Sequence, residues 1–412
     1  MPFWKDPYAW VIEWLRTVLA SWGASPEVAN FWMTLLGVII LGILPLLLTI
    51  ALIWAERKLL GRVQDRIGPN RVGPWGIFQT FADMGKIFTK EYITPAGADW
   101  LPYNLAPILA TAPVIMLWAV IPFSVSMFGV DFSIGILYLI AVGALSEMGI
   151  ILAGWSSNNK FALMSAFRAV AQLVSYEVPL VLTLLIPAML AGSLSLQAVV
   201  LAQSEVWNIF VAPLSAFIFF MVSIAEVGRS PFDLLEAESE LVSGFNIEYS
   251  GLKFGFYYVA DFLHAFTIAM LFATLFLGGW QGPFADQVPI LGFVYYVLKT
   301  LVAWFAALLL RGSLPRFRID QMMNLAWKRY TPLALASVIL VALMHKLVEG
   351  QPLWIYIGAM LVSNLVLWVG LDQWLERFQF HRPRPEVSDH NRPVARPPQA
   401  PVPTPSETGA QS

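Results

Sequence analysis

The feature that most constrains the fold is a series of long apolar segments that recurs along the whole chain. They cover residues 32–54, 105–127, 134–154, 172–191, 206–225, 254–277, 290–310, 332–348 and 353–371. A transmembrane helix needs about 20 apolar residues, whereas membrane β-strands alternate apolar and polar residues over about ten. These segments are helix-sized and do not alternate. Only 13% of the residues are charged, against about 25% in soluble domains. The sequence therefore predicts an all-α polytopic membrane protein of about nine transmembrane helices.

The two ends of the chain differ from this membrane domain, which we expect to span residues 31–372. In residues 1–30, the stretch from Tyr8 to Trp22 mixes tryptophans with charged side chains. This pattern is typical of an amphipathic helix at the membrane surface and not of a cleavable signal peptide. Residues 373–412 are rich in proline, which predicts a disordered cytoplasmic tail.

Lysine and arginine are distributed unevenly among the loops. The loops after the first, third, fifth and seventh segments carry basic residues, whereas the loops after the second, fourth and sixth carry none. Basic residues favour the cytoplasmic side of a membrane. We therefore expect those four basic loops inside, the N-terminus outside and the C-terminal tail in the cytoplasm.

Composition and motifs exclude several kinds of site. The chain has no cysteine and only four histidines, which excludes disulfides and cysteine-ligated iron–sulfur clusters, and we expect no metal site. The glycine-rich stretch GPNRVGPWG at 68–76 lacks the GK[ST] of a nucleotide loop. Its prolines also remove backbone N–H groups that would bind phosphate, so we interpret it as a turn.

Five ionisable residues lie inside or at the edge of the apolar segments: Glu147, Glu177, Asp261, His264 and Lys299. Each costs roughly 2.5–3.5 kcal/mol to insert, so such groups are usually functional. Glu177 precedes Pro179, whose missing hydrogen bond can kink a helix and open a hydrated path. Lys299 is deep enough to predict a buried pair or a proton site. For His264, a local polar contact to a neighbouring helix is an equally simple interpretation, and for Glu147 the alternative is that it caps an aqueous cleft.

The fifth loop is unusually acidic for a side of the membrane that should be basic. The stretch AEVGRSPFDLLEAESELVSGFNIEYSG, residues 225–251, holds one arginine, Arg229, and six carboxylates, Glu226, Asp233, Glu236, Glu238, Glu240 and Glu248. Apolar residues are interleaved with them, which favours buried acids whose mutual repulsion raises the pKa of some of them. A solvated loop is the alternative. Ser230 and Pro231 also suggest that a helix starts there.

Four long stretches carry a resemblance to a known family. They are AERKLLGRVQDRIGPNRVGPWGIFQTFADMGKIFTKE (55–91), GWSSNNKFALMSAFRAVAQLVSYEVP (154–179), residues 225–251 quoted above, and RGSLPRFRIDQMMNLAWK (311–328). In these, the chain resembles the H subunit of proton-pumping NADH:quinone oxidoreductase, the bacterial counterpart of a mitochondrial complex I subunit. All four stretches fall in the loops that the basic residues assign to the cytoplasmic side.

The resemblance implies a membrane-arm subunit of a proton-translocating enzyme in the bacterial inner membrane. Its loops would form a quinone-binding chamber, with the acidic loop 226–253 at the start of a carboxylate path. By resemblance, the proton path contains Glu177, Glu226, Glu236, Glu238, Glu240, Glu248, Asp261, Asp83 and Lys299. The residues around the quinone would be Arg57, Arg66, Arg168, Arg229 and Tyr258. Asp261 stands where the family usually has Glu.

The same resemblance implies that quinone, either ubiquinone or menaquinone, is the substrate. FMN and the iron–sulfur clusters would belong to partner subunits of the complex, among them peripheral cluster-bearing subunits, small membrane subunits and antiporter-like subunits. The nearest alternative is the homologous membrane subunit of a hydrogenase or a deazaflavin (F420) dehydrogenase complex. An autonomous ion-coupled transporter and a purely structural membrane anchor are alternatives of other classes.

Overall fold

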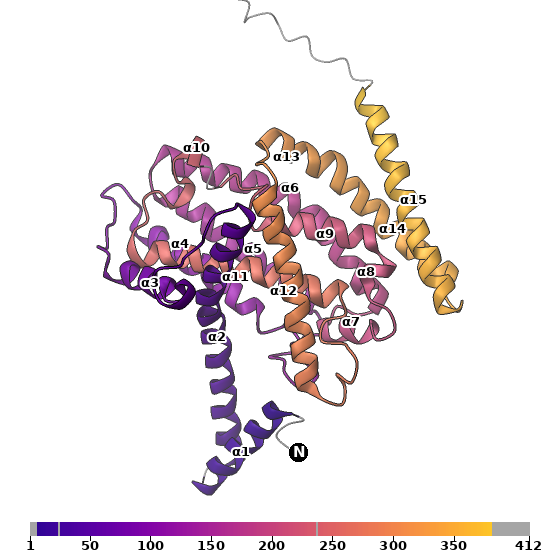
Figure 1. Ribbon diagram of the computed structural model, residues 1–412, viewed down its shortest axis with the longest axis horizontal. Coiled ribbons are helices and arrows are strands. Elements are labelled where there is room, and N and C mark those ends of the chain that lie inside the picture. Colours follow the sequence, from indigo (N-terminus) through magenta and orange to yellow (C-terminus); the bar gives the residue numbers. More distant parts are fainter. Residues whose placement is uncertain (1–5, 24, 236–237, 381–412) are drawn as a thin grey trace, which may run out of the picture.

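The computed structural model describes residues 6–23, 25–235 and 238–380 and contains only helical regular structure in those ranges (Figure 1). The helices are α1 Pro7–Ser21, α2 Pro26–Val63, α3 Gln79–Thr89, α4 Trp100–Leu117, α5 Gly135–Ser156, α6 Lys160–Ala191, α7 Leu196–Ala202, α8 Asn208–Val211, α9 Pro213–Glu226, α10 Glu238–Leu241, α11 Gly251–Phe276, α12 Pro289–Ser313, α13 Ile319–Leu325, α14 Thr331–Val348 and α15 Leu353–Phe380. Short 3-10 turns at Pro74–Gly76 and Gly244–Asn246 and a π-helical turn at Ala326–Tyr330 complete them.

Eight helical stretches in this part of the chain are long and apolar enough to cross a membrane. They are α2, α4, α5, α6, α11, α12, the continuous run from α13 to α14, and the first part of α15. The prediction of an all-α polytopic membrane protein is confirmed.

The predicted span at 206–225 is wrong as a single helix. At Ala212 the backbone leaves the helical region, with φ −132° and ψ 63°, and Pro213 starts a new helix. A residue before proline avoids the α-helical conformation, and proline supplies no N–H for a continuing helix. The resulting α9 has 14 residues, or about 21 Å, which is shorter than the ~30 Å hydrocarbon layer.

Two helices extend well beyond their predicted spans. Helix α2 has 38 residues, about 57 Å, and continues through Glu56, Arg57 and Lys58. Helix α6 begins at Lys160, so Glu177 lies in its middle and not near its start. Glu, Lys and Arg are good helix formers, so the end of an apolar segment marks a change of environment and not the end of a helix.

The N-terminal helices project from the body, whereas α15 lies along its edge beside α14 (Figure 1). The helix expected at Tyr8–Trp22 is present as α1, which packs against α2. Helix α15 runs to Phe380, so the tail predicted as disordered from residue 373 begins with helix. Residues 381–412 lie outside the described residues.

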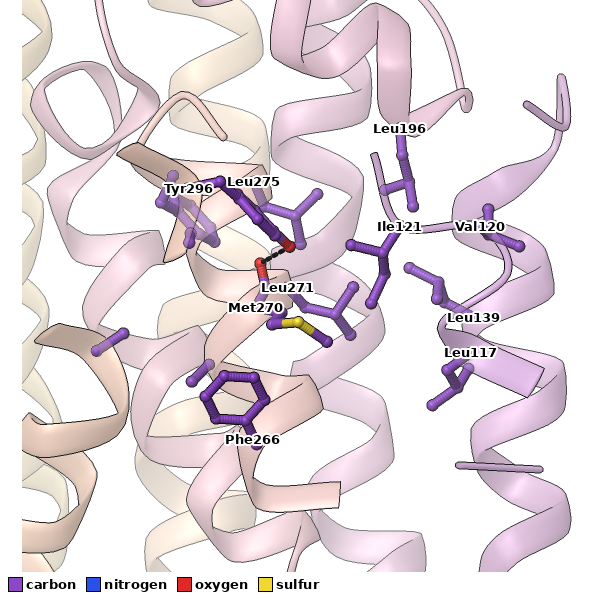
Figure 2. Packing of buried hydrophobic residues seen from close by; sticks show 14 of the residues in the cluster. Leu117, Val120, Ile121, Leu139, Leu196, Phe266, Met270, Leu271, Leu275 and Tyr296 are labelled. Atoms are coloured by element: carbon purple, nitrogen blue, oxygen red, sulfur yellow. Dashed lines mark hydrogen bonds between the residues drawn. The ribbon is translucent and has the colours of Figure 1, made fainter. Parts of the chain in front are cut away.

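The main apolar core lies between α4, α5, α11 and α12. Figure 2 shows Phe266, Met270 and Leu275 of α11 in this core, together with Leu117, Leu139 and Tyr296 from the neighbouring helices. Two polar side chains in this core have hydrogen-bond partners: Trp118 Nε1 donates to Thr267 Oγ1 at 2.9 Å, and the Tyr296 hydroxyl donates to the Met270 carbonyl at 3.1 Å. Buried polar groups need such partners to avoid a desolvation penalty. The core therefore holds α11 at the centre of the bundle.

A close approach of α4 and α5 predicts one sensitive glycine. A Cβ atom at Gly149 of α5 would lie 2.5 Å from Ala110 N and 2.9 Å from Ala106 O, whereas one at Gly143 meets nothing within 4 Å. We expect Gly149→Ala to destabilise the subunit by about 1–3 kcal/mol, because the backbones must move apart. Gly143→Ala is the matched control on the same helix and should be neutral. The temperature at which detergent-extracted protein aggregates measures both, and equal values for the two variants would contradict the prediction.

Candidate functional site

The four loops predicted to be cytoplasmic meet one another through the segment between α9 and α11. The contacts are Arg168 to Glu240 at 2.5 Å, Arg316 to Asp233 at 3.3 Å, Asn159 Nδ2 to Glu248 Oε1 at 2.7 Å, and Ile93 N to Ser250 Oγ at 3.1 Å. Basic loops that are far apart in sequence are therefore joined by the acidic segment. The charge asymmetry of the sequence corresponds to one assembled face of the bundle.

A buried ion network lies beneath this face. The Glu56 side chain of α2 is only 3% exposed and accepts hydrogen bonds from two arginines, Arg229 at 2.6 Å and Arg311 of α12. Arg229 also donates to Asp261 of α11 at 2.9 Å. A buried charge is tolerated only when it is paired and hydrogen-bonded. The network therefore connects α2, α11, α12 and the segment after α9 at one point.

Arg229 remains a cation in this network. Burial by itself lowers the pKa of its guanidinium, but the opposing charges of Asp261 and Glu56 outweigh burial and raise that pKa above its ordinary value. Two carboxylates and two guanidiniums thus balance each other's charge around the buried Glu56–Arg229 pair, while the side chains of Asp261 and Arg311 are 41% and 34% exposed.

The network borders a polar cavity that collects ionisable residues from four parts of the chain. Its lining includes Arg229, Asp261, Arg311, Glu147, Asp233 and His264. Asp261 and His264 were predicted to share a helical face, and both line this cavity. Their common location confirms that part of the prediction.

A second gap lies next to the first and shares one ionisable residue with it. Glu147 and Glu226 line it, together with the buried side chain of Gln172, whose Nε2 donates to the Ala225 carbonyl at 2.5 Å. Glu177 interacts electrostatically with both Glu147 and Glu226. Three acids at membrane depth therefore lie close together, and Glu147, which no sequence motif explained, is in contact with both gaps.

The acids of the fifth loop are buried to different degrees, and their predicted burial is wrong for Glu240. The Asp233 side chain is 26% exposed, and Glu248 is half-buried against Asn159. The Glu240 side chain is 48% exposed. The one-turn helix α10 lies over α6, so the Glu240 side chain reaches Arg168 of α6 at the surface. Glu236 and the side chain of Glu238 lie outside the described residues.

The helix expected to start at Ser230 and Pro231 does not form. The chain from Pro231 to Leu235 is non-helical, with Phe232 and Leu234 fully buried against α6 and α13. Residues i and i+2 point to different sides of a helix, so burying both side chains on one surface favours a non-helical backbone, and tertiary packing overrides the local signal.

Most of the residues predicted to surround the quinone lie outside the buried ion network. Arg57 pairs with Asp83 of α3 at 2.5 Å, with side chains 42% and 26% exposed. Arg66 donates to Gln64 at 2.9 Å, and it lines an open pocket together with Arg57. Arg168 is paired with Glu240, as above. Among these arginines, Arg229 alone belongs to the buried network.

Tyr258 belongs to a row of aromatic rings along α11. Its ring centre lies 5.2 Å from that of Phe254 and 5.9 Å from that of Phe262. The guanidinium of Arg229 lies 4.9 Å from the centre of the Phe262 ring. Tyr258 is 40% exposed, whereas Phe262 is 7% exposed. The row therefore leads from an exposed ring to the buried network.

Lys299 is remote from all of these groups. It precedes Arg311 by about three helical turns on α12, or about 18 Å. Its Nζ donates to the carbonyls of Gly279 at 3.0 Å and Gln281 at 2.7 Å, and it lies 4.3 Å from the ring centre of Trp207. Backbone carbonyls and an aromatic face, and not a carboxylate, stabilise this ammonium.

Sequence reasoning missed two members of the network, Glu56 and Arg311. Both lie at the loop-face edge of an apolar segment, where charges are usually assigned to solvated loops. The available signal was the absence of a helix breaker after Trp54, which keeps Glu56 on the same helix as the apolar residues. None of the described residues forms a group of three His, Cys, Asp or Glu suited to a metal ion.

Comparison with known proteins identifies the family of this chain. The family model described as NADH dehydrogenase matches residues 36–342. Among curated relatives, the H subunit of NADH-quinone oxidoreductase from Dehalococcoides mccartyi strain CBDB1 is 45% identical over 316 residues, which cover 76% of this chain and 88% of the relative. The corresponding H subunit from Brevibacillus brevis is 43% identical over 80% of this chain and 97% of its own length. This chain belongs to the family of NADH-quinone oxidoreductase H subunits.

The family assignment confirms the resemblance drawn from the four sequence stretches. The matched region, residues 36–342, contains every member of the buried network and both gaps of this H-type subunit. It excludes α1 and α15, the two helices at the periphery of the bundle (Figure 1).

The buried network predicts that Glu56 is essential for stability. Glu56→Gln keeps the side-chain shape but leaves two arginines with one carboxylate fewer, and breaking a buried pair costs about 3–5 kcal/mol. We expect a large fall in the amount of assembled complex and in its inactivation temperature. Asp320→Asn is the control, because the pair of Asp320 with Arg318 has side chains 60% and 76% exposed and such pairs contribute about 0–1 kcal/mol. Equal stability of the two variants would refute the prediction.

Proposed function

We propose that this chain forms the quinone-binding chamber of NADH:quinone oxidoreductase and the start of the carboxylate path that couples quinone reduction to proton translocation. The observation that carries the proposal is the position of Arg229. Its guanidinium lies over Phe262, at the end of the aromatic row, and it holds both Glu56 and Asp261 beside the polar cavity. One side chain thus joins a surface suited to a flat ring with a group of acids.

The aromatic row supports binding of a quinone headgroup. Aromatic rings stack on flat ligands in offset or edge-to-face arrangements. Tyr258, the middle ring of the row, is accessible, and Arg229 supplies a positive charge at the Phe262 end. Quinone reduction takes up two electrons and two protons, so negative charge develops on the headgroup before protonation is complete. In this proposal, that charge attracts Arg229 and weakens its hold on the carboxylates.

The arrangement of the acids supports the coupling step. Electrostatic interactions are several times stronger in a protein interior than in water, so a change at Arg229 acts on Asp261 and on the cavity residues Glu147 and Asp233. The second gap extends the series to Glu226, which interacts electrostatically with Glu177. Moving one charge across 100 mV requires about 2.3 kcal/mol, so a path of this kind must respond to the quinone and not leak.

In this proposal, the remaining residues predicted for the proton path take part in different steps of it. Glu240, Glu248 and Asp83 lie at the loop face, where we infer proton uptake from the cytoplasm. Glu236 and Glu238 keep their predicted role from the resemblance. Lys299 lies toward the opposite end of α12 and therefore belongs to a later step of the path.

The proposal assigns the other parts of the reaction to partner subunits. FMN and the iron–sulfur clusters belong to peripheral subunits, which we expect to dock on the face formed by the four basic loops. Small membrane subunits and antiporter-like subunits continue the path. Quinone reaches this chain from the bilayer of the bacterial inner membrane. Family membership favours this function over a separate transporter or a structural anchor.

Tyr258 tests the quinone-binding part of the proposal. Tyr258→Ala removes the exposed ring of the row, and ring–ring stacking contributes about 0.5–1.5 kcal/mol. We expect the KM for a short-chain quinone to rise by roughly three- to tenfold. Phe256→Ala is the matched control, since Phe256 is also exposed, at 37%, but lies two residues away on another side of α11. A KM that changes equally in both variants, or in neither, would argue against this site.

Asp261 and Glu177 test the coupling part. We expect Asp261→Asn and Glu177→Gln each to lower inhibitor-sensitive NADH:quinone activity of membranes by about tenfold, or ~1.4 kcal/mol of transition-state stabilisation. NADH oxidation by ferricyanide should be unchanged, because that reaction does not need the quinone site. Glu349→Gln, a substitution of an exposed acid at the end of α14, is the control. A purely structural anchor would leave quinone activity intact in all three variants once assembly is verified.

A further inference from the structure

A buried lysine that neither the sequence motifs nor the proposed path uses lies at the start of α11. Lys253 is 5% exposed, and its Nζ has no hydrogen-bond acceptor among the described residues. Its Nζ lies instead 4.2 Å from the ring centre of Tyr103 on α4 and 4.4 Å from that of Tyr92 in the segment after α3. Two aromatic faces can stabilise an ammonium by cation–π interactions, which are strongest when the cation is desolvated.

The two walls of this cage differ in how firmly they are held. Tyr103 is fully buried, stacks on Tyr249 at 4.3 Å between ring centres, and donates to the Glu248 carbonyl at 2.8 Å. Tyr92 is 63% exposed, and its hydroxyl donates to Asn104 Oδ1 over a long 3.5 Å. The lysine thus connects a fixed part of the bundle to the exposed ring of Tyr92. Loss of the cation would release the Tyr92 segment without removing an apolar core residue.

The segment held by Lys253 directly follows α3, and it docks on α11 together with the end of that helix. A Cβ at Gly251 would lie 3.3 Å from the Lys90 carbonyl, and one at Gly255 would lie 3.0 Å from the Ile87 side chain. Ser250 completes the contact, because its Oγ donates to the Glu91 carbonyl at 3.2 Å. Helix α3 therefore docks closely on the first turns of α11, and the Lys253 cage closes this junction.

The docked face of α11 is also the face of the aromatic row. Residues at i, i+4, i+7 and i+11 lie on one side of a helix, and Gly251, Gly255, Tyr258 and Phe262 have this spacing. Helix α3 covers the first two positions, and Tyr258 follows at the third, still 40% exposed. This spacing places Tyr258 next to the two positions that α3 covers.

We infer that Lys253, held between Tyr92 and Tyr103, is a positioning residue that fixes α3 against α11 and thereby sets the access of quinone to the aromatic row. This inference rests on the proposed function of Tyr258. Lys253 does not touch the quinone. It acts through α3, which also carries Asp83, the partner of Arg57.

The test uses the assembled enzyme in native membranes and steady-state kinetics with a short-chain quinone. Lys253→Met keeps the apolar stem and removes the cation. Tyr92→Leu removes the exposed ring without disturbing the core, so it remains informative where Lys253→Met assembles poorly. Tyr92→Phe is the matched control, because it keeps the aromatic face and loses only the hydroxyl. NADH oxidation by ferricyanide measures the amount of enzyme.

We expect Lys253→Met and Tyr92→Leu to raise the quinone KM by at least about fivefold with kcat changed less than about twofold, since they alter binding and not chemistry. Tyr92→Phe should match the wild type. Wild-type KM in Tyr92→Leu, equal effects of the Leu and Phe variants, or a loss confined to kcat would each overturn the inference. If Tyr258→Ala raises KM while the Tyr92 and Lys253 variants do not, the positioning role fails and the quinone site stands. If Tyr258→Ala also has no effect, the proposed function itself fails.

Discussion

The need to pair buried charges with opposite charges determines the architecture around the candidate site. Glu56 is almost completely buried, and two arginines from distant parts of the chain neutralise it. An isolated ion in such a place would cost many kcal/mol. Because each charged partner belongs to a different helix or loop, forming the ion pairs brings these elements together. The network thereby fixes α2, α11, α12 and the segment after α9 relative to one another.

Helix α11 combines three environments on one rod. Its C-terminal half, around Phe266 to Phe276, packs into the apolar core, its middle carries Asp261 and His264 at the polar cavity, and its first turns dock α3. Because the core packs at high density, small shifts at one end are transmitted and not absorbed. A helix held in this way can connect an event at the aromatic row with the acids on its other side.

The two ends of the bundle use charge differently. At the loop face, carboxylates and arginines from several loops are paired, and some of these pairs are partly exposed. Toward the opposite end, Lys299 is bound by carbonyls of the turn after α11 and by Trp207. Ion pairs with several partners can be exchanged for one another, whereas the lysine at the opposite end has backbone carbonyls as its hydrogen-bond acceptors. The early steps of the proposed path therefore lie at the loop face, and Lys299 belongs to a later step.

The sequence by itself determined the helical membrane class, the approximate positions of most spans and the set of loops that assemble together, because apolar length and basic residues report directly on the bilayer. It also indicated Asp261, His264, Glu177 and Arg229 as candidates, the first three through the cost of charge at membrane depth. The predictions were wrong where contacts with neighbouring residues or helices determine the local structure. The three cases are the helix break at Pro213, the non-helical backbone around Phe232 and the exposure of Glu240. That Glu56 and Arg311 complete the network, that Glu147 lines two gaps and that Lys299 lies apart became visible only in the packed structure. Those facts depend on which helices pack against one another. The local sequence of a helix does not indicate which partner its charged side chain will contact in the folded protein.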